Sequence, residues 1–157
     1  MPGTTSHRPL VVKLLAFLEV FLGVNGLIGG IPFLLAPDGS ILGMTPIQLQ
    51  KTPFLDFTVP GLLLTLYLGL YPLAAAYALW QLPSWRWPDL INPFRQFHWS
   101  WAGSMAAGVI SVIWIIVQIQ WIPFGFLHFF IFFWGVLIMR VALLPGVRDY
   151  CKRASSA

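Results

Sequence analysis

The stretch Leu10–Leu35, LVVKLLAFLEVFLGVNGLIGGIPFLL, decides the fold because it is almost entirely apolar. At 1.5 Å per residue, a helix over this stretch would be roughly 39 Å long, enough to cross a membrane. The stretch is too long for a cleavable signal peptide, and it contains Lys13, Glu19 and Asn25. We therefore expect a span that is retained in the protein.

Three further apolar runs lie downstream of the first, at about residues 58–82, 97–122 and 124–144. Each is long enough to cross the hydrocarbon core of a bilayer as a helix. The turn between the last two runs is short, which makes them antiparallel neighbours. The runs predict an all-α integral membrane protein with a single membrane domain over residues 1–157, folded as a four-transmembrane-helix bundle.

The composition agrees with this class of protein, because 58% of the residues are hydrophobic and only 9% are charged. The net charge of +4 comes from basic residues in short stretches beside the spans. Membrane lipids, and not nucleic acid, are the partners that such stretches favour. The single cysteine, Cys151, excludes an internal disulfide and a multi-cysteine metal site within one chain. We expect no metal site.

The orientation follows from the nine Lys and Arg residues, of which only Lys51 falls on the outer side of the predicted membrane. Such a bias predicts that both termini lie in the cytoplasm and that residues 145–157 form a basic cytoplasmic tail. A bacterial inner membrane is the expected location. The basic residues on the inner side are Arg8, Lys13, Arg86, Arg95, Arg140, Arg148, Lys152 and Arg153.

The two longer connections have different sequence signals. In the outer loop, Thr45 followed by Pro46 and Gln48 predicts a short interfacial helix with Thr45 as its N-cap and Gln48 completing a capping box. The inner connection is rich in Pro and Trp, which is typical of an anchor in the headgroup layer. It is also a candidate docking surface for another subunit, formed by Trp85, Arg86 and Trp87.

Small residues recur at helical spacing in the first and third runs. Such stripes let two helix backbones approach closely, so we predict that the first and third spans pack together. The alternative is that one stripe faces a second protein chain. The predicted packing residues are Gly23, Gly26 and Gly30 on the first run, with Ser104 and Gly108 on the third.

Glu19 is the most consequential polar residue, because an ionised carboxylate inside a membrane needs a partner. Arg140 on the fourth run lies at a similar depth, and we predict a buried ion pair between the two. Two alternatives are a proton-linked or substrate-linked role for Glu19, and an Arg140 side chain that extends to the interface instead.

A second group of polar residues lies toward the outer side, on four different runs. These side chains could converge on a site for a lipid, a quinone or another apolar ligand, beside a bend at Pro72. The alternative is that each one satisfies a nearby backbone group or lies in the headgroup layer. The candidate ligand-binding residues are Asn25, Tyr67, Tyr71, Gln118 and His128.

The sequence contains no catalytic constellation and no phosphate-binding glycine motif. We expect a non-catalytic membrane subunit or accessory protein that assembles with itself or with other membrane chains through helix packing. One alternative is a small carrier of an apolar ligand with a protonatable Glu19. Another is a pigment-binding subunit with a single axial histidine, His98 or His128, which begin their spans on opposite sides of the predicted membrane.

Overall fold

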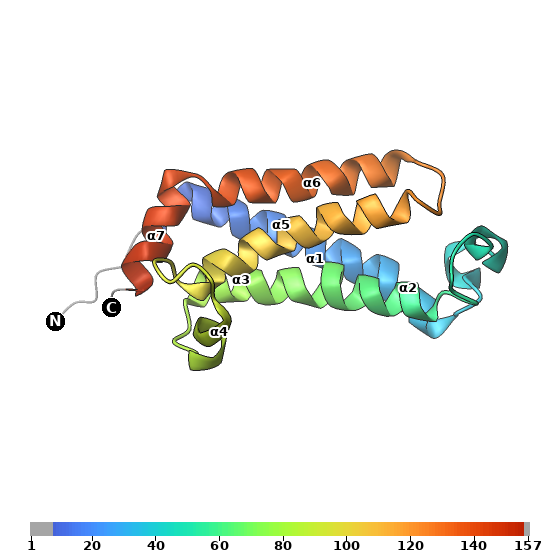
Figure 1. Ribbon diagram of the computed structural model, residues 1–157, viewed down its shortest axis with the longest axis horizontal. Coiled ribbons are helices and arrows are strands. Elements are labelled where there is room, and N and C mark those ends of the chain that lie inside the picture. The colour runs from blue at the N-terminus through green and yellow to red at the C-terminus, as the bar shows by residue number, and fades with distance from the viewer. Residues whose placement is uncertain (1–7, 156–157) are drawn as a thin grey trace.

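The structure, a computed structural model, describes residues 8–155, and every regular element in that range is helical. Four long helical rods form the bundle, and shorter helices lie at its two ends (Figure 1). The rods are α1 (Leu10–Leu35), a second rod made of α2 (Thr58–Leu63), η3 (Leu64–Leu70) and α3 (Tyr71–Gln81), then α5 (Trp99–Gln118) and α6 (Phe126–Ala142). The short helices are η1 (Ser40–Leu42), η2 (Pro46–Leu49), α4 (Arg86–Ile91) and α7 (Pro145–Ser155).

Consecutive rods run antiparallel (Figure 1), and their contacts place the four rods at the corners of a square. Helix α1 packs on the second rod and on α6, and α5 packs on the same two rods, so α1 and α5 lie across the diagonal. The prediction that the first and third spans are packing partners is therefore wrong. The start of α1, α4 and α7 lie at one end, here named the α4–α7 end, and η1 and η2 lie at the other (Figure 1).

Three of the rods, α1, the second rod and α5, are individually long and apolar enough to cross a membrane. Helix α6 meets the same test only together with α7, from which it is bent by 59°. The described residues thus form an all-helical bundle with three or four helices of membrane-spanning length, as the apolar runs predict. The basic tail is not an extended segment, because α7 turns its Val147 and Cys151 into the core.

The second rod continues through Pro72 as a helix, because a π-helical stretch, η3, comes directly before it. Proline has no N–H to donate, and its ring clashes with the carbonyl group four residues earlier in a regular α-helix. The wider π turn relieves this conflict. The carbonyl group in question belongs to Leu68, which lies against Gly26 of α1.

The outer loop folds back on the bundle as two 3₁₀ helices, η1 and η2. The predicted capping box is wrong, because the Thr45 side chain makes no cap hydrogen bond. Helix η2 does begin with Pro46, whose fixed φ suits a first turn. The loop is held instead by burial, since the Phe57 ring stacks on Phe33 of α1 at 4.6 Å between centroids, with Leu49 buried beside them.

Glycines bring α1 into backbone contact with the second rod. A Cβ added at Gly26 would collide with the Leu68 carbonyl group, and one at Gly23 would lie 2.8 Å from the carbonyl oxygen of Gly69. A Cβ added at Gly30 would likewise be crowded by Thr65. The glycine stripe of α1 is therefore used inside the chain, against the second rod.

A matching contact joins α5 and α6. A Cβ at Gly108 would lie 2.7 Å from the carbonyl oxygen of Gly135, and a Cβ at Gly135 would lie 2.8 Å from that of Gly108. The bundle thus consists of two pairs of rods, each held together by glycines at its contact.

We predict that Gly26→Ala lowers the stability of the protein by about 1–3 kcal/mol, because the added methyl group overpacks the contact with Leu68. Gly29→Ala is the matched control, since no atom lies within 4 Å of a Cβ at Gly29. Alanine there stabilises the helix by up to about 1 kcal/mol. Thermal unfolding in mild detergent measures the change in stability for both variants. Equal effects of the two substitutions would contradict the glycine-mediated contact.

Candidate functional site

The most unusual site in the bundle is Glu19, which lies near its central axis with 0% of its surface exposed. Neither carboxyl oxygen has a hydrogen-bond partner. The hydroxyl group of Ser104, on α5, lies beside the carboxyl group and is also buried without a partner. Because α1 and α5 face each other across the diagonal, the two side chains meet in the middle of the bundle.

The backbone around this pair is firmly tied by aromatic side chains. The Trp134 indole of α6 donates to the carbonyl oxygen of Leu18 at 3.0 Å, and the Tyr71 hydroxyl of α3 donates to that of Gly103 at 3.2 Å. Leu18 and Gly103 are the residues directly before Glu19 and Ser104. The backbone on both sides is therefore positioned by hydrogen bonds, while the two side chains between them remain unpaired.

His98 caps α5 at the α4–α7 end. Its Nδ1 accepts the backbone N–H of Ser100 at 3.2 Å and lies 2.9 Å from the Ser100 hydroxyl oxygen. The proton is accordingly assigned to Nε2, which lies 3.2 Å from the carbonyl oxygen of Pro83. Burial lowers the pKa of His98, opposed by the Pro83 hydrogen bond and by Asp89. The imidazole is a neutral cap.

Helix α7 closes the same end of the bundle. The backbone N–H of His98 donates to the carbonyl oxygen of Cys151 at 3.3 Å, and the buried Cys151 thiol lies beside the Ser100 hydroxyl. Ser100 and Ser104 are one turn apart on the same face of α5, and both are fully buried. Polar side chains therefore extend from His98 toward Glu19. The sequence shows the serine spacing, but it does not show that Cys151 joins them.

The predicted ion pair between Glu19 and Arg140 does not form. Arg140 is exposed, and the Glu19 oxygens have no partner. The sequence indicates the depth of Arg140 along its helix, but not the direction in which the side chain points around the helix axis. At this level α6 turns Ile138 and Val141 into the core, which places the arginine on the outer face.

The five candidate ligand-binding residues do not form a common site. The exposed Asn25 donates to the carbonyl oxygen of Phe21 on its own helix, at 2.8 Å, and Tyr67 is exposed. Tyr71 bonds to Gly103 deeper in the bundle, and Gln118 is half-buried at the end of α5. His128 accepts the N–H of Gly125 at 3.1 Å. Asn25 and His128 thus match the alternative, in which each side chain forms a hydrogen bond with a nearby backbone group.

His98 and His128 differ in whether a ring nitrogen is free to bind a pigment or a metal ion. Both ring nitrogens of His98 have partners, whereas for His128 a partner is found for Nδ1 alone, so of these two described histidines His128 is the one that could serve as an axial ligand. Within residues 8–155, no three His, Cys, Asp or Glu side chains are grouped as a metal site requires.

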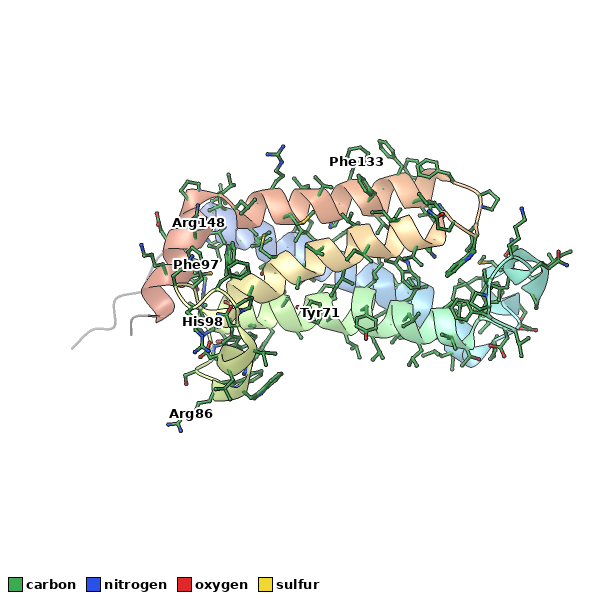
Figure 2. All side chains as sticks on the ribbon, in the orientation of Figure 1. Tyr71, Arg86, Phe97, His98, Phe133 and Arg148 are labelled. Atoms are coloured by element: carbon green, nitrogen blue, oxygen red, sulfur yellow. The ribbon has the colours of Figure 1, made fainter. Side chains whose placement is uncertain are left out.

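The predicted docking residues do lie together, on a surface of α4 that projects from the bundle (Figure 1). Trp85, Arg86 and Trp87 line an open hollow of about 630 Å³ with Ser84. The Trp85 ring stacks on Trp99 at 5.7 Å, which anchors this surface to α5. The Arg86 side chain points away from the bundle (Figure 2).

We predict that His98 makes the stability pH-dependent. Its folded pKa is lowered, so the unfolded chain binds the proton more readily, with an ordinary pKa of about 6.5. The contribution of His98 is complete above about pH 6.5 and is lost as the pH falls toward the folded pKa. His98→Asn keeps a cap acceptor and removes this dependence. Thermal midpoints measured between about pH 8 and pH 5 test it. If the thermal midpoints of the wild type and of His98→Asn changed with pH in the same way, the assignment of His98 as a neutral cap would be contradicted.

Comparison with known proteins adds no further assignment, since no family model, no curated protein and no solved structure matches the chain. A helical bundle by itself hosts many functions.

Proposed function

We propose that the chain is a non-catalytic integral membrane subunit or accessory protein that assembles with itself or with another membrane chain through helix packing. The observation that carries this proposal is an exposed apolar face on α6, here named the α6 ridge. Its members, at spacings of three and four residues, are Phe126, Phe129, Phe133 and Leu137. Figure 2 shows Phe133 on the outer side of α6.

The α6 ridge is a suitable surface for a partner because its side chains follow one another along one helix face and two of its rings contact each other. Phe129 and Phe133 contact each other with ring centroids 4.4 Å apart. The glycine-lined faces of α1 and α5 are already used inside the chain, so they are not available to a second chain. A contiguous apolar surface of this kind is normally covered by lipid or by protein.

Insertion into a bilayer is supported by the distribution of basic and aromatic side chains over the two ends of the bundle. At the α4–α7 end, the Arg8 guanidinium lies 4.4 Å from the centre of the Trp80 ring, and Arg86 and Trp87 extend from α4. Lys51 lies in the loop at the other end. We infer that the α4–α7 end faces the cytoplasm of a bacterial cell.

We predict that a cysteine at position 51 reacts with a membrane-impermeant maleimide in intact cells, whereas one at position 84 reacts only after lysis. The variants Lys51→Cys and Ser84→Cys are made in a Cys151→Ala background, so that each has one thiol. Both positions lie in connections between the rods, at opposite ends. Labelling of both positions in intact cells, or of neither, would contradict the inferred orientation.

We predict that Phe129→Ala combined with Phe133→Ala weakens assembly at least about tenfold, which corresponds to about 1.4 kcal/mol. Native mass spectrometry in mild detergent reports the masses of the complexes and so separates self-association from binding to another chain. The matched control is Leu62→Ala with Leu66→Ala, which shortens exposed side chains on the second rod. A wild-type protein that is always a single chain, or equal effects of both variants, would contradict the proposal.

A further inference from the structure

The pairing of Glu19 with Ser104 indicates what kind of ligand the centre of the bundle accepts. Buried polar groups in proteins almost always have a partner, because an unpaired one loses its hydration without compensation. Here three buried oxygen atoms, two from Glu19 and one from Ser104, have no hydrogen-bond partner. An ionised Glu19 can only accept the hydroxyl proton of the neighbouring Ser104, whereas a protonated Glu19 also carries a donor of its own for this pair.

The groups around Glu19 favour the smallest possible ligand. Tyr71 from the second rod and Cys151 from α7 are titratable side chains within electrostatic reach of Glu19. Helix α6 contributes the indole of Trp134, and α5 contributes Ser104. A calcium ion takes six to eight oxygen ligands, several of them commonly carboxylates, and in the described residues no three His, Cys, Asp or Glu side chains are grouped. A proton needs one oxygen.

Polar side chains connect this site to the α4–α7 end. Ser104 and Ser100 are one turn apart, roughly 6 Å along the α5 axis, a gap short enough for one water molecule to bridge. The Ser100 hydroxyl oxygen lies 2.9 Å from Nδ1 of His98. Figure 2 shows His98 at this end of the bundle, beside α4.

We propose that Glu19 is a proton-binding site, reached from the α4–α7 end along His98, Ser100 and Ser104. In the binding step a hydronium ion releases a proton and becomes water, and the proton forms an O–H bond with one Glu19 oxygen and cancels the carboxylate charge. Nothing is oxidised or reduced. The new O–H donates to the Ser104 hydroxyl oxygen, so both side chains gain a partner. The site goes beyond the proposed assembly role, and it does not depend on the α6 ridge.

The composition of the chain makes a direct test possible, because Glu19 is its only glutamate. Cell-free synthesis with glutamate carrying ¹³C at the side-chain carboxyl group labels this one site, and NMR in lipid nanodiscs follows its signal between about pH 4 and pH 10. We expect a reversible titration. Ser104→Ala shifts its midpoint by at least about half a pH unit, a threefold change in proton affinity. Ser111→Ala is the matched control, since this buried serine on α5 bonds to its own helix at Ala107.

The path has its own measurement, the rate at which the labelled carboxyl group exchanges its proton for deuterium, read by infrared spectroscopy. We expect Ser100→Ala to slow this exchange at least about tenfold and Ser111→Ala to leave it unchanged. Should Ser104→Ala not fold, Ser104→Thr retains the hydroxyl group and should preserve the wild-type midpoint. A carboxyl signal that does not titrate, or a midpoint that shifts equally in Ser104→Ala and Ser111→Ala, would overturn the site. An exchange rate unaffected by Ser100→Ala would overturn the path.

Discussion

The backbone contact between α1 and the second rod is the constraint on which the rest of the structure depends. At Gly26 the two helices approach so closely that no side chain fits between the α1 backbone and the Leu68 carbonyl group of the second rod. A contact of this kind determines both the separation of the helices and the rotation of α1 about its axis. Once that rotation is set, Glu19, two turns before Gly26 on the same face, is directed to the inside of the bundle.

The two glycine-packed pairs are then joined by hydrogen bonds from large aromatic side chains. Trp134 connects α6 to α1, and Tyr71 connects α3 to α5. Such bonds satisfy the polar ends of these rings while their apolar parts fill the space between rods that do not approach as closely. Glycines thus set the contacts within each pair, and aromatic residues set the distance between the pairs. The small polar centre with Glu19 and Ser104 lies where these four contacts meet.

Much of the fold could be predicted from the sequence, because the length and apolar character of Leu10–Leu35 and the later runs depend on local composition alone. The partners of the helices could not. A stripe of glycines shows which face of a helix is smooth, but not which helix it meets, and so α1 was assigned to the wrong neighbour. The Arg140 prediction failed similarly, because depth along a helix can be counted and rotation in the bundle cannot. Glu19 and Ser104 were each recognised, but their meeting depends on the diagonal arrangement.

Stability gives no reason for a carboxyl group in the middle of this bundle. The glycine contacts and the aromatic hydrogen bonds position α1 without using the Glu19 side chain. A buried polar group that lacks a partner costs about 1–3 kcal/mol, and more when it is charged, whereas an apolar side chain of similar volume would contribute favourable packing. A group that the fold does not need, placed where its charge is costly, is typical of a functional site. Proton binding accounts for this placement, because it removes the costly charge and leaves a carboxyl O–H that donates to the Ser104 hydroxyl oxygen.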